Sequence, residues 1–248
     1  MRIALLILTL SLAAQAQYLQ VVPAKAPGNC ELRSDKMEQW LLDWPNLARY
    51  RQADAEVSSS EAKDRVVFMG DSITDAWKLD ASFPGRNYVN RGISGQTTSQ
   101  MLVRFQQDVV NLRPAAVVIL AGTNDIAGNS GPVSVEDIEN NFRAMVAIAN
   151  ANKIAVVVAA VTPVHNYTER SQRFYRERPM EKIRALNDWL KDSASTYHYR
   201  YVDDFTPLLD EKGLLKRELA DDGLHPNATG YEIMAKLFQA AIDKSLKH

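Results

Sequence analysis

Two unbroken apolar runs constrain the fold of this chain more than any other feature. Residues 115–122 read AAVVILAG, and residues 154–161 read IAVVVAAV. A strand with one face in water alternates apolar and polar side chains, whereas a strand buried on both faces is apolar throughout. Both runs are therefore typical of buried strands in a parallel sheet that is covered by helices.

Shorter runs and helical repeats surround these two strands. RVVFMG at 65–70, NYVNRG at 87–92 and YRYVD at 199–203 predict three more strands. Ser134 followed by Asp137 is a capping box, which indicates the start of a helix. Because strands that alternate with helices need crossover connections, we predict an α/β fold with a parallel sheet. The apolar positions that repeat at helical spacing are Met101, Leu102, Phe105, Val109, Leu112, Ile138, Phe142, Met145, Val146, Ala149, Ile183, Leu186, Leu190, Ile233, Met234, Leu237 and Phe238.

One domain accounts for this whole pattern. We place it at residues 31–248 and expect a helical preface at 31–62, which Pro45 breaks or kinks. Residues 17–30 read as a linker rich in proline and small residues. Cys30, at its end, is the one cysteine of the sequence, so an intramolecular disulfide and a thiolate metal cluster are excluded.

The N-terminus has the layout of a secretory signal peptide. Arg2 precedes an apolar run at 3–14, and the triplet AQA at 14–16 matches an A-x-A cleavage site. We expect residues 1–16 to be removed by cleavage after Ala16, which leaves a secreted or periplasmic protein with no stable membrane insertion. The alternative is an uncleaved membrane anchor, although the apolar run is short for a membrane span.

Polar and glycine-rich segments follow the predicted strands where the strands end. They are GDSIT at 70–74, GISGQTT at 92–98, GTNDIAG at 122–128 and TPVHNY at 162–167, and DDGLHP at 221–226 precedes the last helix. In an open parallel sheet, ligands bind outside the carboxyl ends of the strands. The rule selects the first four segments, and together with DDGLHP they gather polar and glycine-rich residues at one rim, where we expect a functional site.

Ser72 is the first candidate for chemistry at this rim. It opens a helix, where serine is also a common N-cap, so capping is the stronger interpretation of Ser72 alone. A nucleophilic serine needs a base within hydrogen-bond reach and a third group that holds the base. His225 can be that base, because a histidine imidazole is mostly neutral around pH 7. Either Asp221 or Asp222 can reach the imidazole through a turn at Gly223.

Acyl transfer also requires hydrogen-bond donors for an oxyanion. The candidates are the backbone N–H of Ser72 at a helix N-terminus, the backbone N–H of Gly95 and the side-chain amide of Asn124. Each of the last two has an ordinary alternative. Gly95 can be a plain turn glycine, and Asn124 can cap a helix or a turn.

Four of these segments, taken in order, resemble the SGNH or GDSL-type hydrolases, a family named for Ser, Gly, Asn and His in four sequence blocks. GDSIT contains Ser72, RGISGQTT contains Gly95, GTND contains Asn124, and DGLHP contains His225. The resemblance covers about residues 65–245.

The resemblance implies a flavodoxin-like three-layer sandwich, with a five-stranded parallel sheet and helices on both faces. It also implies a carboxylic ester hydrolase that uses no cofactor and no metal. Through the family spacing D-x-x-H, it assigns Asp222 to a catalytic triad with Ser72 and His225. It further assigns Ser72, Gly95 and Asn124 to an oxyanion hole.

The substrate is indicated in outline. GDSIT, GISGQTT and GTND are also similar to the blocks of platelet-activating-factor acetylhydrolase-type members, which, together with secretion, favours removal of acetyl or other short acyl groups from a carbohydrate or lipid. The alternatives are a lysophospholipase or thioesterase that acts on longer acyl chains. Residues 163–179 are a candidate pocket wall, with His165 and Tyr167 as candidate substrate contacts.

Other classes of function are less well supported. A non-catalytic module that binds glycans or lipids is one, but the presence of Ser72, Asn124 and His225 counts against it. A metal site of His225 with Asp221, Asp222 and Asp125 is another, but no second histidine lies at metal-ligand spacing. The net charge of −1 gives no indication of a nucleic-acid partner.

Overall fold

A computed structural model describes residues 41–59 and 64–247 of the chain. The predicted signal peptide, the linker at 17–30, Cys30 and the first part of the helical preface lie outside the described residues. Among the helices in the described part of the chain, none combines the length and the apolar character of a membrane span.

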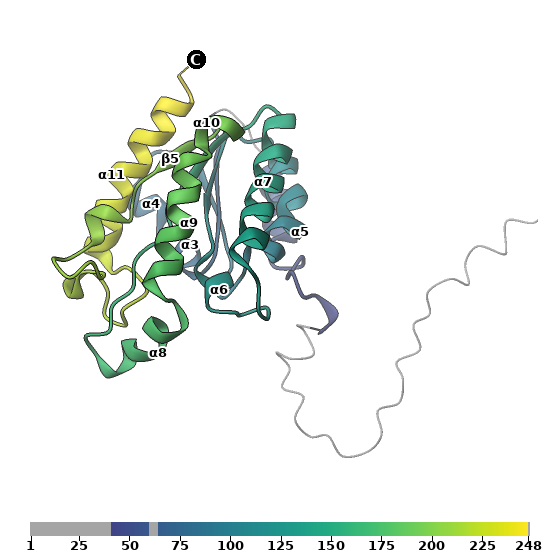
Figure 1. The fold of residues 1–248 in the computed structure, drawn as a ribbon. Coiled ribbons are helices and arrows are strands. Elements are labelled where there is room, and N and C mark those ends of the chain that lie inside the picture. The colour runs from purple at the N-terminus through teal and green to yellow at the C-terminus, as the bar shows by residue number, and fades with distance from the viewer. Residues whose placement is uncertain (1–40, 60–63, 248) are drawn as a thin grey trace, which may run out of the picture. The chain divides into compact units, whose positions relative to one another are not determined.

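Five parallel strands form one sheet in the order β2-β1-β3-β4-β5 (Figure 1). The two long apolar runs form β3 and β4, and the three shorter runs form β1, β2 and β5, as predicted. This order is the flavodoxin-like arrangement, in which β1 and β3 flank the switch point where ligands bind. The strands are β1 Val66–Gly70, β2 Tyr88–Gly92, β3 Ala116–Leu120, β4 Ala155–Ala159 and β5 Arg200–Val202.

Helices connect these strands and cover the sheet. Short 3₁₀ turns lie at η2 Val110–Leu112, η3 Thr206–Leu208 and η4 Arg217–Leu219. The helices are α2 Arg51–Ser59, α3 Ser72–Asp75, α4 Leu79–Ser82, α5 Thr98–Asp108, α6 Thr123–Ile126, α7 Val135–Ala151, α8 Glu169–Glu177, α9 Met180–Asp192, α10 Ala194–Tyr197 and α11 Ala228–Ser245.

The core has two halves, because successive strand residues point to opposite faces of the sheet. Val67 and Met69 of β1 belong to the half that includes α5, α7 and α9. Val66 and Phe68 belong to the half that includes α3, α4 and α11. Figure 1 shows α11 on one side of the sheet and α7 on the other. The predicted three-layer sandwich with helices on both faces is therefore confirmed.

Two predicted helix signals have clear local outcomes. The capping box is present at the start of α7, where Ser134 Oγ accepts from the Asp137 N–H at 3.1 Å and Asp137 Oδ2 accepts from the Ser134 N–H at 2.9 Å. The predicted helical repeat that runs from Met101 to Leu112 is interrupted, since α5 ends at Asp108 and a 3₁₀ turn continues to Leu112. Leu112 is nevertheless fully buried, so the apolar repeat correctly indicates a buried position beyond the end of the helix.

Candidate active site

The predicted rim segments meet through hydrogen bonds that cross between them. The Ile93 N–H donates to the Gly70 carbonyl at 3.0 Å, which places the second segment beside the first. Asn124 Nδ2 donates to the Gln96 carbonyl at 3.0 Å, which joins the third segment to the second. The segments converge because β1, β2 and β3 are parallel neighbours whose carboxyl ends lie at the same edge of the sheet.

Ser72 follows β1 and is the first residue of α3. The N-cap of this helix is Asp71, whose Oδ1 accepts from the Ile73 N–H at 2.9 Å. Ser72 therefore does not serve as the cap, and its hydroxyl is available for another contact. Ser72 Oγ lies 2.8 Å from Nε2 of His225, 153 residues further along the chain.

Asp222 holds the other side of the His225 ring. Its Oδ2 lies 2.7 Å from Nδ1 of His225. Its Oδ1 accepts from the backbone N–H groups of Leu224 at 3.0 Å and His225 at 2.9 Å. One carboxylate thus fixes both the ring and the backbone of the histidine. Asp221, the alternative left open by the residues alone, is exposed.

Gly223 shapes the turn between Asp222 and His225. Its φ is +85°, in the left-handed region that favours glycine. A Cβ at this position would lie 2.4 Å from Cβ of Ser171 and 2.8 Å from the His165 carbonyl. The turn is therefore packed closely under α8, and a side chain would displace it.

The two aspartates beside this serine and histidine have opposite electrostatic settings. Burial raises the pKa of Asp222, but the hydrogen bonds from the His225 ring and from two backbone N–H groups lower it further, so its net pKa is below the ordinary value. Asp222 is therefore an anion at neutral pH and can stabilise a protonated imidazole. Asp71 is fully buried, and burial raises its pKa to about 7. Its Oδ2 has no hydrogen-bond partner among the described residues.

Asn124 lies in the short helix α6 that follows β3, and it is buried. Gly95 lies in the loop after β2, with a φ of +83° and an exposed backbone. The bond from Asn124 Nδ2 to the Gln96 carbonyl brings the amide to the residue that follows Gly95. The structure therefore brings the two predicted oxyanion donors to the same loop.

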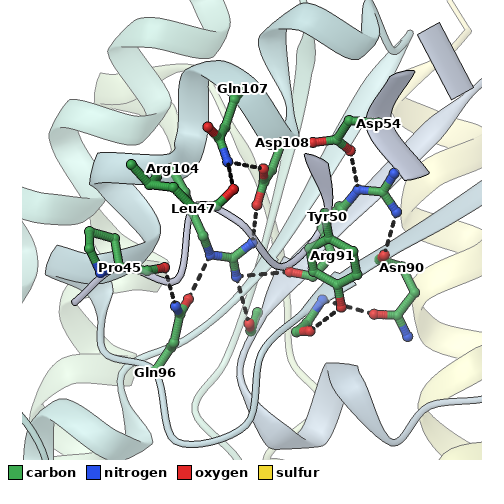
Figure 2. A network of polar contacts seen from close by, with 12 residues as sticks. Pro45, Leu47, Tyr50, Asp54, Asn90, Arg91, Gln96, Arg104, Gln107 and Asp108 are labelled. Atoms are coloured by element: carbon green, nitrogen blue, oxygen red, sulfur yellow. Dashed lines mark hydrogen bonds and ion pairs between the residues drawn. The ribbon is translucent and has the colours of Figure 1, made fainter. Parts of the chain in front are cut away.

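Figure 2 shows a buried polar network that supports this loop. Arg104 of α5 is fully buried, and its Nη2 donates to the carbonyls of Gly70 at 3.1 Å and Arg91 at 2.8 Å. Its Nε donates to Gln96 Oε1 at 2.6 Å, and its Nη1 donates to Asp108 Oδ2 at 2.8 Å. One guanidinium therefore ties the strand end before Ser72 to the loop that carries Gly95.

The turn at residues 43–50 lies against the same network. The Pro45 carbonyl accepts from Gln96 Nε2 at 2.7 Å, and the Tyr50 hydroxyl donates to the Gly92 carbonyl. Figure 2 shows Tyr50 and Pro45 meeting the network from this segment. Contacts at Gly92 and Gln96 hold the loop at both ends, so the part of the preface that the structure describes contributes to the position of the loop.

The two candidate substrate contacts lie in different settings. His165 is fully buried, its Nε2 lies 2.9 Å from the Ala220 carbonyl, and its backbone N–H donates to Gly223. These bonds hold the turn that precedes His225. Because the side chain of His165 is fully buried, it has no exposed surface for a substrate. Tyr167 is partly exposed, and its hydroxyl donates to Asp210. This hydrogen bond is the main reason that the pKa of Tyr167 is raised to about 12.

Two residues of the predicted pocket wall approach the site, although the sequence did not single them out. The Phe174 ring of α8 meets the His225 ring edge-to-face, with centroids 6.0 Å apart. Arg178 is 3% exposed, and its Nη2 donates to Asn124 Oδ1 at 3.1 Å. Phe174 lies in α8 and Arg178 is the residue that follows this helix, so no helical repeat in the sequence marks both as facing the site.

Asp125, a member of the alternative metal site, has another partner. Its carboxylate accepts from the Thr98 N–H at 3.0 Å and from the Thr98 hydroxyl at 2.5 Å, at the start of α5. Within residues 41–59 and 64–247, no group of three or more His, Cys, Asp or Glu side chains is arranged to hold a metal ion.

The chain is similar to known ester hydrolases. Residues 68–233 match the GDSL-like Lipase/Acylhydrolase family. A candidate acylhydrolase of known structure from Bacteroides fragilis is 39% identical, with a TM-score of 0.76 over 83% of this chain and 99% of that chain. An acetylxylan esterase from Geobacillus stearothermophilus is 26% identical over 71% of this chain and 92% of that protein. A Streptococcus pneumonia structure described as a candidate platelet activating factor is 28% identical, with a TM-score of 0.69 over 84% of this chain and 100% of that chain.

The family match spans the blocks that contain Ser72, Gly95, Asn124 and His225. The predicted resemblance to the SGNH hydrolases is therefore confirmed. The chain belongs to the GDSL-like lipase/acylhydrolase family and is a carboxylic ester hydrolase.

Proposed function

We propose that this protein is an exported serine esterase that removes short acyl groups, acetyl in particular, through a triad of Ser72, His225 and Asp222. The observation that carries the proposal is the continuous hydrogen-bonded chain from Ser72 Oγ through the two ring nitrogens of His225 to Asp222 Oδ2. This is the order of nucleophile, base and orienting carboxylate that serine acyl transfer requires.

In the first half of the reaction, Ser72 Oγ attacks the ester carbonyl carbon while Nε2 of His225 takes the hydroxyl proton. The tetrahedral intermediate collapses when the imidazolium returns that proton to the leaving alcohol oxygen. Asp222 stabilises the imidazolium through Nδ1 and keeps the ring in place. The products of this half are the free alcohol and an acyl ester on Ser72.

In the second half, a water molecule attacks the acyl carbonyl carbon while Nε2 of His225 takes its proton. The proton then goes to Ser72 Oγ as the acyl–oxygen bond breaks, and the carboxylic acid leaves. The negative charge of both tetrahedral intermediates is stabilised by the backbone N–H groups of Ser72 and Gly95 and by the amide of Asn124. The reaction consumes water and uses no redox step.

A fluorophosphonate probe tests the nucleophile. The probe phosphonylates an activated serine, so the wild-type protein is expected to be labelled and Ser72→Ala is not. The same variant is expected to lose at least about a thousandfold in kcat for p-nitrophenyl acetate, because the attacking atom is removed. Equal labelling of both proteins, or near-wild-type turnover by the variant, contradicts the assignment.

The short-acyl preference has support from the acetylxylan esterase relative. A chain-length series of nitrophenyl esters, measured beside acetylated xylan and acetylated pectin, tests it. We expect the highest kcat/KM for acetyl esters and release of acetate from at least one polysaccharide. A maximum at eight or more carbons would instead indicate a lysophospholipase or thioesterase, and glycan binding without hydrolysis would indicate a binding module.

Export is tested on the protein itself. We expect protein recovered outside the cytoplasm to begin at Gln17, after cleavage that follows Ala16. Intact-mass measurement distinguishes this product from a chain that keeps Met1, which would favour the membrane-anchor alternative.

A further inference from the structure

The Asn124 amide is held at both ends by groups that accept only one orientation. Its Nδ2 donates to the Gln96 carbonyl at 3.0 Å, and its Oδ1 accepts from Arg178 Nη2 at 3.1 Å. A carbonyl can only accept, and a guanidinium can only donate. Reversal of the amide would therefore oppose oxygen to oxygen at Gln96 and donor to donor at Arg178. These two contacts set which end of the amide carries the N–H groups.

This orientation matters for an oxyanion donor. An amide nitrogen carries two N–H groups, and the Gln96 carbonyl takes one of them. The second N–H of Asn124 is left to donate to a developing oxyanion. A reversed amide would present its oxygen to the same negative charge, which is repulsive. The positive guanidinium on Oδ1 also draws electron density from the amide, which strengthens its N–H groups as donors.

Arg178 is itself held rigidly. It follows α8, its Nε donates to Thr123 Oγ1 at 3.0 Å, and its Nη1 lies 3.4 Å from Glu177 Oε2. Its guanidinium carbon lies 5.3 Å from the centre of the Phe174 ring. Burial lowers the pKa of Arg178, but a guanidinium remains charged at neutral pH. The molecule thus keeps a buried positive charge directly behind Asn124.

We infer that Arg178 is a positioning residue for ester hydrolysis: it fixes and polarises the Asn124 amide so that this amide stabilises the oxyanion. The inference rests on the proposed function, in which Asn124 is an oxyanion donor. Because the oxyanion exists only in the transition state and the intermediates, Arg178 acts on kcat and leaves KM nearly unchanged.

A double-mutant cycle tests this coupling. The variants are Arg178→Met, Asn124→Ala and the two together, and the readout is kcat and KM for p-nitrophenyl acetate. We expect R178M to lower kcat about 10- to 100-fold with KM within about twofold, and N124A to lower kcat about 10²- to 10³-fold. In the N124A background, R178M is expected to change kcat by less than about twofold, because its route to the oxyanion is already gone.

Two further variants make the result specific. Arg178→Lys keeps the positive charge and an N–H donor for Asn124 Oδ1, so it is expected to recover part of the kcat that R178M loses. Arg176→Met removes an exposed arginine of α8, two residues before Arg178, and is expected to retain wild-type kcat. If R178M does not fold, as judged by circular dichroism, the R178K cycle makes the same comparison.

The outcomes separate the two proposals. If R178M or R178K lowers kcat equally with and without Asn124, Arg178 acts by another route, such as the Phe174 ring against His225, and the inference is overturned. A change in KM alone overturns it as well. If Ser72→Ala remains active, the proposed function fails first, whatever the cycle shows.

Discussion

The carboxylate of Asp222 bonds both the imidazole of His225, at 2.7 Å from Nδ1, and the backbone N–H of the same residue, at 2.9 Å. The short turn through Gly223 makes this possible, since it returns the chain toward the carboxylate within three residues. Ring orientation and loop conformation at His225 therefore depend on one side chain.

Replacement of Asp222 is expected to separate it from its neighbour. Asp222→Asn offers Nδ1 an amide in place of an anion, which no longer stabilises the imidazolium, and we expect kcat to fall about 10³- to 10⁴-fold. Asp221→Asn changes an exposed side chain and is expected to keep wild-type kcat. Steady-state hydrolysis of p-nitrophenyl acetate measures both. Equal activity of the two variants would remove Asp222 from the triad.

The turn itself can be tested through Gly223. Gly223→Ala combines a left-handed backbone with a Cβ only 2.4 Å from Cβ of Ser171, so we expect a loss of roughly 3 kcal/mol or more in the free energy of unfolding. Gly85→Ala is the matched control, because its φ is +75° but no atom lies within 4 Å of the added Cβ. Backbone strain alone predicts about 1 to 2 kcal/mol there. Urea unfolding compares the two, and equal losses would argue against a tight contact at Gly223.

The buried carboxyl of Asp71 predicts a pH dependence of stability. Its folded-state pKa of about 7 lies above the ordinary value of 3.8, so the folded protein binds more protons between these limits. Proton binding by Asp71 therefore stabilises the folded state at low pH, and this stabilisation is lost as the pH rises from 3.8 through about 7. Asp71→Asn removes the titrating group. Its free energy of unfolding relative to wild type should therefore rise by roughly 2 to 3 kcal/mol when the pH is raised from 5 to 8. Urea unfolding at the two pH values measures this gain, and parallel behaviour of the two proteins would contradict it.

The ion pair of Arg104 and Asp108 is buried on both sides, with side chains 0% and 1% exposed. Arg104→Met leaves the Asp108 carboxylate without its counter-charge, and we expect a loss of about 3 to 5 kcal/mol in unfolding free energy. Arg104→Met with Asp108→Asn removes the uncompensated charge and is expected to recover part of this loss. Chemical denaturation of the two variants provides the test. A double variant less stable than the single one would show that the unpaired Asp108 charge is not the main cause of the lost stability.

The architecture could be predicted from the sequence because it depends on local pattern. The apolar runs at 115–122 and 154–161 are typical of strands buried on both faces, and helices between strands require crossover connections. The same pattern locates the strand ends, and so it selected the segments that contain Ser72, Gly95 and Asn124. The apolar pattern predicted a buried residue even where the chain is not α-helical, as at Leu112 at the end of a 3₁₀ turn.

Contacts between distant segments were decided only by the tertiary structure. The residues alone left Asp221 and Asp222 open, and family spacing favoured Asp222. The direction of each side chain depends on the left-handed turn at Gly223 and its packing under α8. His165 was a candidate substrate contact, but it is fully buried and bonds to the Ala220 carbonyl and to the Gly223 carbonyl.

Arg178 shows the same division between sequence and structure. Arg178 lies in a segment at 163–179 with several arginines, and such a segment can equally form an exposed helix. Composition therefore does not distinguish an exposed Arg178 from a buried one. Its role depends on meeting Asn124, 54 residues earlier, at hydrogen-bond distance. The sequence by itself determined the parallel α/β fold and the rim of the site, because burial periodicity is local. Only the tertiary structure decided which polar groups pair there, because a hydrogen bond requires a distance and direction that packing alone supplies.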